Sequence, residues 1–199
     1  MFIGVYNKSV FFSFLGLLFS ILSCIFLING NIKLSMFFFM LIGLIDMLDG
    51  RIANMTKRTK FEKKFGIQID TILDVFNFSA IPLAIIYLLG FTDTITIIFS
   101  IFYVFTSIMR LAYFNTLSES GNDPDIYYGI PTTTISLYLP LMVLLYTIIN
   151  NIWVIRIMLF IISISYIINI KIIKPHSLKF YLSMISIGLL ILLGIIFIL

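Results

Sequence analysis

Long apolar stretches and short polar joints alternate along the chain. Apolar runs bounded by turn-forming residues predict seven helices, which we place near 9–28, 34–55, 67–90, 94–117, 130–149, 152–172 and 178–198. Most of these runs have about the 20 residues that a helix needs to cross a hydrocarbon core about 30 Å thick. Turn residues such as NGN at 29–31 and NN at 150–151 separate neighbouring helices.

The composition places these helices in a membrane. Of the 199 residues, 61% are hydrophobic and only 11% are charged, and the mean hydropathy is +1.15. These values exclude an ordinary soluble domain. We therefore predict an all-α, polytopic transmembrane bundle of about seven helices (six to eight), which forms one integral membrane domain over residues 1–199. The single cysteine, Cys24, excludes an internal disulfide and a multi-thiolate metal site.

Positive charge in the connections predicts the orientation of the bundle. Lys and Arg concentrate in the short cytoplasmic loops of membrane proteins. With the N-terminus inside, ten of the thirteen Lys and Arg residues face the cytoplasm, most of them within 51–64 and 171–179. We predict a multi-pass protein of the cell membrane, with an active site that faces the cytoplasm.

Four aspartates interrupt the apolar pattern. Asp46 and Asp49 are three residues apart near the end of the second predicted helix, and Asp70 and Asp74 are four apart in the third. On a helix with 3.6 residues per turn, each pair shares one face. Because a cytoplasmic connection joins the two helices, antiparallel packing can bring both pairs to one depth. Ionisable groups within membrane spans usually mark a functional pathway or site. We therefore expect these four carboxylates to converge at a functional site.

Divalent cations would relieve the repulsion among four carboxylates. Oxygen ligands without nearby His or Cys suit Mg²⁺ or Mn²⁺ rather than zinc or copper. Two such ions, about 3.5 to 4 Å apart, form the clamp that enzymes use for displacement at phosphorus. Helix capping, or pairing with Arg51 or Lys57, is the simpler alternative, and it explains four acids at this spacing poorly.

The residues around the aspartates resemble the signature of the CDP-alcohol phosphotransferases, D-x2-D-G-x2-A-R…G-x3-D-x3-D. The chain has the matching residues in the same order: Asp46, Asp49, Gly50, Ala53, Gly66, Asp70 and Asp74. The family arginine is replaced by Asn54, and the gap before the second glycine is longer than in the family. Arg51, Lys57 and Arg58 are candidates to replace this arginine.

Other segments resemble the bacterial and archaeal phosphatidylserine synthases of the same family. They are DVFNFSAIP from Asp74, MRLAYFN at 109–115, YYGIP at 127–131 and KIIKPH at 171–176. The resemblance implies a transferase that joins L-serine to CDP-diacylglycerol and releases CMP, with two Mg²⁺ or Mn²⁺ ions as cofactors. It also implies a homodimer among membrane lipids, and no nucleic-acid partner.

The resemblance further implies roles for single residues. The metal ligands would be Asp46, Asp49, Asp70 and Asp74. Asp74 would also act as the general base on the serine hydroxyl. Gly50 and Gly66, where the backbone can approach a ligand closely, would lie against the substrate together with Ala53.

Arg110 is a further cation within a predicted span. Its guanidinium offers a fork of donors that suits a lipid phosphate or the carboxylate of an amino acid. Asn115 follows a little more than one helical turn later and is expected to line the same cavity. We predict that both bind substrate; the alternative for Arg110 is an ion pair with an aspartate or contact with the membrane interface.

Three other functions stay open at this point. The acceptor could be glycerol 3-phosphate, inositol phosphate or another alcohol, although a phosphorylated acceptor should require more cations than Arg110 alone. A cation transporter could use the aspartates as an ion pathway, but it would be expected to carry polar residues across the full membrane depth. A catalytically inactive relative is the third alternative, and Asn54 is the residue that suggests it.

Overall fold

The structure is a computed structural model that describes residues 3–55, 58–119, 126–173 and 178–198. Within these ranges it does not describe the side chains of residues 8–9, 49–55, 118–119, 126–127, 173 and 178. The elements are, in order, α1 (Lys8–Ile28), α2 (Ile32–Met55), α3 (Lys60–Val75), η1 (Phe76–Ala80), α4 (Ile81–Leu88), α5 (Thr94–Glu119), β1 (Ile126–Tyr128), η2 (Thr132–Thr134), α6 (Ile135–Ile149), α7 (Trp153–Ile167), β2 (Lys171–Ile173) and α8 (Leu178–Ile198).

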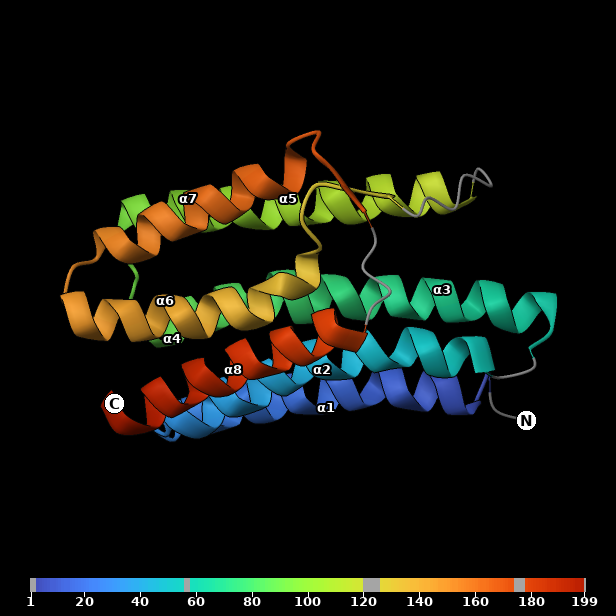
Figure 1. Ribbon diagram of the computed structural model, residues 1–199, viewed down its shortest axis with the longest axis horizontal. Coiled ribbons are helices and arrows are strands. Elements are labelled where there is room, and N and C mark those ends of the chain that lie inside the picture. Colours follow the sequence, from blue (N-terminus) through green and yellow to red (C-terminus); the bar gives the residue numbers. More distant parts are fainter. Residues whose placement is uncertain (1–2, 56–57, 120–125, 174–177, 199) are drawn as a thin grey trace.

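The helices run roughly along one axis and form three layers (Figure 1). Helices α5 and α7 pack together in one outer layer, and α1, α2 and α8 form the opposite one. The rod made of α3, η1 and α4 lies between them together with α6. Since α3, η1 and α4 are continuous, the described residues form seven helical rods, as the sequence predicts.

The first two helices form an antiparallel hairpin whose turn chemistry is visible in the sequence. The amide side chain of Asn7 accepts a hydrogen bond from the backbone N–H of Val10 and caps α1. Gly30 follows the helix with a φ of +77°, a conformation that costs glycine little. The side chain of Asn31 then accepts from the N–H of Leu34 at the start of α2.

Helix α3 begins at Lys60, seven residues before the predicted start at 67, and this boundary of the prediction is wrong. Thr59 and Glu62 form a capping box: the Thr59 hydroxyl accepts from the N–H of Glu62, and the Glu62 carboxylate accepts from the N–H of Thr59. The prediction followed the apolar run alone and overlooked this polar signal for a helix start.

A single π-turn interrupts the central rod. The backbone N–H of Ile81 bonds to the carbonyl of Phe76, five residues back, over the segment η1. Pro82 has no N–H to donate to the carbonyl of Phe78, four residues before it. The buried hydroxyl of Tyr103 on α5 donates to this carbonyl instead. The proline and the tyrosine together explain why the rod changes its winding here without breaking.

The connection before α6 is held against the end of α7. Strand β1 pairs antiparallel with β2, and the N–H of Gly129 donates to the carbonyl of Ile170. Gly129 has a φ of +71°, and a Cβ there would lie 2.6 Å from the carbonyl oxygen of Tyr166. Only glycine therefore fits this close approach. Because Lys171–Ile173 forms β2, helix α7 ends at Ile167 and not at the predicted 172.

Five of the described helical segments are long and apolar enough to cross a membrane: Val10–Ile28, Lys60–Leu88, Thr94–Leu117, Thr132–Ile149 and Lys179–Ile198. Helix α7 is apolar but shorter, with 15 residues. Helix α2 is 24 residues long but contains both Asp46 and Asp49. The chain is a multi-pass membrane protein, and α2, one of the two helices that carry the aspartates, is a long helix outside this set of five.

Candidate active site

Three of the predicted aspartates meet at one small polar cavity, which we call the acidic cavity. It is lined by Asp46 and two apolar residues of α2, by Asp70, Leu73 and Asp74 of α3, by Asn77 of η1, and by two residues of α1: the full set is Ser13, Gly16, Ile42, Ile45, Asp46, Asp70, Leu73, Asp74 and Asn77. Its volume of about 10 Å³ is room for roughly one water-sized body. The predicted convergence of the two helices is thus present in the structure.

Asp46 stands at the centre of the charge in this cavity. Its carboxyl group is within hydrogen-bonding reach of Asp74 and interacts electrostatically with Asp70 and Arg110. Arg110 is buried, with 8% of its surface exposed. The three carboxyl groups of the cavity thus outnumber the one guanidinium that interacts with Asp46. Such an arrangement favours a positively charged ligand.

Part of the predicted site lies outside the described residues. For Asp49, Gly50 and Ala53 the structure describes only a helical backbone at the end of α2. Their predicted roles in metal and substrate binding remain predictions.

Gly66 lies on α3, four residues before Asp70, and faces a basic side chain. A Cβ at Gly66 would be 3.3 Å from Nη1 of Arg58. Among the three candidates to replace the family arginine, Arg58 is the one whose side chain the structure describes, and it lies next to the second glycine of the signature. The absence of a side chain at Gly66 leaves room for this guanidinium.

Arg110 and Asn115 both lie close to the site, but neither lines the acidic cavity. The Arg110 guanidinium stacks 5.3 Å from the ring centroid of Phe114 and interacts electrostatically with Tyr166 as well as with Asp46. The side-chain amide of Asn115 donates to the hydroxyl of Thr71 at 2.7 Å, next to Asp70 on α3. Asn115 therefore ties α5 to α3 beside the acids, and its predicted role in substrate binding remains a prediction.

Sequence reasoning missed the contribution of the first helix and of Asn77. Ser13 and Gly16 of α1 form one wall of the acidic cavity. The buried hydroxyl of Ser20 donates to Oδ1 of Asn77 at 2.6 Å. A signal was available, because Ser13, Gly16 and Ser20 recur at helical spacing in an otherwise apolar helix. This spacing does not indicate which residues of other helices the three side chains would contact, because those contacts depend on tertiary packing.

The donor set of the acidic cavity suits a hard divalent cation. Its described lining offers carboxylate, amide and hydroxyl oxygens, with no thiolate or imidazole, and these are the ligands that Mg²⁺ and Mn²⁺ prefer. Within the part of the chain whose side chains are described, no three His, Cys, Asp or Glu residues are arranged as a set that could hold a metal ion. The lining therefore fits a divalent cation in the chemistry of its donors, whereas the described carboxyl groups are not arranged as a preformed metal site.

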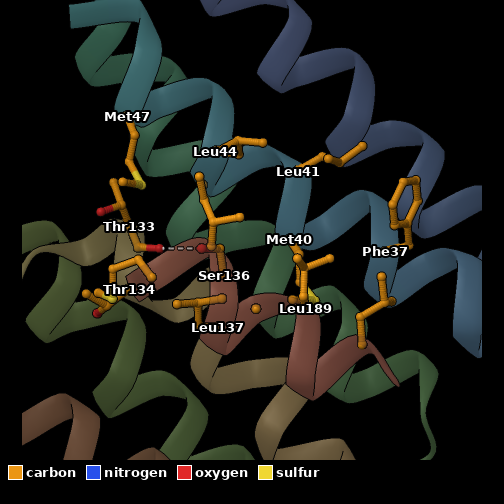
Figure 2. A pocket seen from close by; sticks show the side chains of 15 residues that line it. Phe37, Met40, Leu41, Leu44, Met47, Thr133, Thr134, Ser136, Leu137 and Leu189 are labelled. Atoms are coloured by element: carbon orange, nitrogen blue, oxygen red, sulfur yellow. Dashed lines mark hydrogen bonds between the residues drawn. The ribbon is translucent and has the colours of Figure 1, made fainter. Parts of the chain in front are cut away.

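A second, apolar cavity lies on the opposite face of α2 (Figure 2). Its volume is about 150 Å³. Phe37, Met40, Leu41, Leu44 and Met47 of α2 line it, together with residues of η2, α6 and α8. The helices can approach closely here because Gly43 and Gly188, which also line it, carry no side chain. A cavity with this predominantly apolar lining suits a hydrocarbon group.

A separate ion pair holds the joint between α4 and α5 against α7. Nη2 of Arg156 lies 2.6 Å from Oδ2 of Asp93, and the guanidinium lies 4.8 Å from the ring centroid of Trp153. Asp93 also accepts from the hydroxyl and the backbone N–H of Thr96. These two hydrogen bonds, followed by the Arg156 guanidinium, lower the pKa of the Asp93 carboxyl to about 2. We call Asp93, Thr96, Trp153 and Arg156 the α4–α7 clamp.

Residues 7–192 match the family described as CDP-alcohol phosphatidyltransferase, and the chain belongs to this family of enzymes. The match confirms the resemblance to this family, and it identifies an enzyme family rather than a cation transporter.

The chain is also similar to several CDP-diacylglycerol–serine O-phosphatidyltransferases. It is 31% identical to one from Saccharomyces cerevisiae over 132 residues, which are 61% of this chain and 47% of the relative. It is 36% identical to one from Helicobacter pylori over 104 residues, 51% of this chain and 42% of the relative. One from Mycobacterium tuberculosis is 26% identical over 94 residues, 45% of this chain and 32% of the relative. The chain thus spans less than half the length of these relatives.

Proposed function

We propose that this protein transfers the phosphatidyl group of CDP-diacylglycerol to L-serine and releases CMP. The observation that carries the proposal is the convergence of Asp46, Asp70 and Asp74 on one cavity, in a membrane protein of the CDP-alcohol phosphatidyltransferase family. The choice of serine is supported by the relatives, which are serine O-phosphatidyltransferases.

In the proposed reaction, the serine hydroxyl oxygen attacks the phosphorus atom that carries the diacylglycerol. A bond forms between this oxygen and phosphorus, and the bond from the same phosphorus to the CMP oxygen breaks. Asp74 takes the hydroxyl proton, because a carboxylate within hydrogen-bonding reach of the nucleophile can act as a general base. CMP leaves with the electron pair of the broken bond.

Asp46, Asp49, Asp70 and Asp74 would hold divalent cations, and the family signature supports two Mg²⁺ or Mn²⁺ ions. When bound, the cations would supply positive charge to the pyrophosphate and to the departing CMP. The described cavity supports this role by its oxygen donors and its excess of negative charge. Asp49 would complete the set from the next turn of α2.

Arg110 would hold the carboxylate of the acceptor. It is a buried guanidinium within electrostatic range of Asp46, so a group bound to it would lie next to the acids. A planar guanidinium binds a carboxylate through two parallel hydrogen bonds. Arg58, beside Gly66, is the residue that we propose in place of the family arginine at Asn54.

The apolar cavity on the other face of α2 suits an acyl chain of the lipid substrate. Basic residues in the connection between α2 and α3 support a cytoplasmic location in the cell membrane for the end of the bundle at which these two helices are joined. We further propose, on the family resemblance alone, that the protein works as a homodimer.

The decisive experiment measures CMP release from CDP-diacylglycerol by the purified protein. Serine, glycerol 3-phosphate and inositol phosphate are compared in parallel, each with Mn²⁺, with Mg²⁺ and with a chelator. We expect CMP release with serine that stops in chelator and returns when Mn²⁺ or Mg²⁺ is restored. Release with a phosphorylated acceptor in place of serine would overturn the proposed acceptor. Release that persists in chelator, or none with any acceptor, would overturn the proposed mechanism.

A further inference from the structure

Asn77 is a buried polar residue of the acidic cavity to which the family signature gives no role. It is 4% exposed, lies in the π-turn η1, and follows Asp70 and Asp74 by seven and three residues. This spacing continues the face of α3 that carries the two aspartates. The side chain accordingly lines the same cavity as they do.

The orientation of the Asn77 amide is set from α1. Ser20 is fully buried, and its hydroxyl donates to Oδ1 of Asn77 at 2.6 Å. The other end of the amide, Nδ2, lies 3.2 Å from the position that a Cβ of Gly16 would occupy, on the wall of the cavity. With Oδ1 held by Ser20, the NH₂ group lies at the lining that Asn77 shares with the three aspartates.

Hydrogen-bond donors are scarce in this lining. Of the described residues around the cavity, three are aspartates and four are the nonpolar residues Gly16, Ile42, Ile45 and Leu73. Only Ser13 and Asn77 remain as side chains that can donate. Carboxylates that bind a metal are themselves usually held by hydrogen bonds from neighbouring groups, and these bonds fix their direction.

We propose that Asn77 is a positioning residue, which donates its amide hydrogens to the carboxylates of the acidic cavity and so tunes their affinity for a divalent cation. Ser20 acts through Asn77 by holding the amide in this orientation. The inference rests on the proposed cation-dependent function and adds two residues, Ser20 and Asn77, that the motif does not contain.

The test measures Mn²⁺ binding to the purified full-length protein by electron paramagnetic resonance, without substrate. The variants are Asn77→Ala, Ser20→Ala and the double variant. Ser23→Ala is the matched control: Ser23 is also fully buried on α1 and bonds across to Ser35 of α2, but it does not line the cavity. Apparent melting temperatures, kcat and KM are recorded for each variant.

We expect Asn77→Ala to weaken Mn²⁺ binding about tenfold, in the range typical for groups that support metal ligands. Ser20→Ala should weaken it less, and the double variant should bind Mn²⁺ as Asn77→Ala does, because Ser20 acts only through Asn77. Ser23→Ala should lower the melting temperature as much as Ser20→Ala and leave Mn²⁺ affinity unchanged.

Two results would overturn the inference while leaving the proposed function in place. One is wild-type Mn²⁺ affinity in Asn77→Ala, and the other is equal weakening by Ser20→Ala and Ser23→Ala, which would indicate a general loss of packing. A wild-type protein that binds no Mn²⁺ but releases CMP from CDP-diacylglycerol would overturn the cation site and the role of Asn77 together.

Discussion

Two clusters of charge in this protein differ in how their charges are balanced. In the α4–α7 clamp one carboxylate meets one guanidinium, and Asp93 accepts from Thr96 and Arg156. In the acidic cavity three carboxyl groups lie together, and the guanidinium of Arg110, outside the cavity lining, interacts with Asp46. The clamp lies where α4 joins α5, at one end of the bundle, whereas the acids lie midway along the rod from Lys60 to Leu88 (Figure 1).

This difference indicates a structural role for the α4–α7 clamp and a functional role for the acidic cavity. A balanced pair whose hydrogen bonds are satisfied can be explained by its contribution to stability. An excess of like charge in a buried cavity raises the free energy of the protein unless a proton or a cation neutralises it, and ionisable groups at such places in membrane spans usually mark a functional site. The comparison therefore predicts that changes in the cavity affect turnover, and that changes in the clamp affect stability.

The largest effect is expected from Asp74→Asn. The amide cannot accept the serine proton, and loss of a general base typically costs about 10² to 10⁴ in rate. CMP release should fall by about this factor while the apparent melting temperature stays at the wild-type value or rises, because one repelling charge is removed. Wild-type turnover in this variant would refute Asp74 as the base.

Arg110→Lys should produce the next largest effect. Lysine keeps the positive charge near Asp46 but loses the two parallel donors that suit a carboxylate. We expect KM for serine to rise about 10-fold to 100-fold, in line with the loss of a hydrogen bond to a charged group, with a smaller change in kcat. Arg156→Lys is the matched control and should leave KM for serine unchanged. An equal rise of KM for serine in both variants would contradict the functional difference that we infer between the two clusters.

Arg156→Met should destabilise the folded protein without lowering its turnover rate. The change leaves Asp93 without its guanidinium partner and removes the contact with Trp153. We expect the apparent melting temperature to fall by several degrees while kcat stays within about twofold of wild type, since the clamp is remote from the acids. A loss of activity at temperatures where the variant is folded would show that the clamp also serves catalysis.

The clamp also predicts how stability depends on pH. The pKa of Asp93 in the folded protein, about 2, lies below the usual value of 3.8. A carboxyl group with a lowered pKa stabilises the folded state fully above its unfolded pKa, and this contribution is lost as pH falls toward the folded pKa. The difference in melting temperature between wild type and Asp93→Asn should thus be constant above about pH 5 and shrink between about pH 4 and 2. A constant difference over that lower range would contradict the assignment.

The smallest effect is expected from Tyr103→Phe. The change leaves the Phe78 carbonyl, which Pro82 deprives of its helical donor, without a buried partner. A lost hydrogen bond of this kind costs about 1 kcal/mol, with up to about 3 kcal/mol where the acceptor is left buried. Thermal unfolding should show this loss, with turnover changed by less than about fivefold. Tyr113→Phe, at an exposed tyrosine of the same helix, should change neither.

Much of this fold could be predicted because membrane helices are encoded locally. The apolar runs predict the seven rods, and Asn31 and Gly30 mark the first turn. The start of α3 was predicted too late because Lys60 to Gly66 is polar, although Thr59 and Glu62 carry a capping signal. The end of α7 was predicted too late because Lys171–Ile173 continues the apolar run and yet pairs with β1 as a strand.

The sequence by itself determined a membrane-spanning helical bundle with two pairs of aspartates, because hydrophobicity and the spacing of 3.6 residues per turn are properties of single segments. Only the tertiary structure decided that Ser20 supports Asn77, that Asp93 meets Arg156 63 residues away, and that Asn115 bonds to Thr71 outside the cavity. These contacts join helices that are distant in the chain. Which side chains meet depends on how the helices rotate and pack against one another, and no local pattern contains that information.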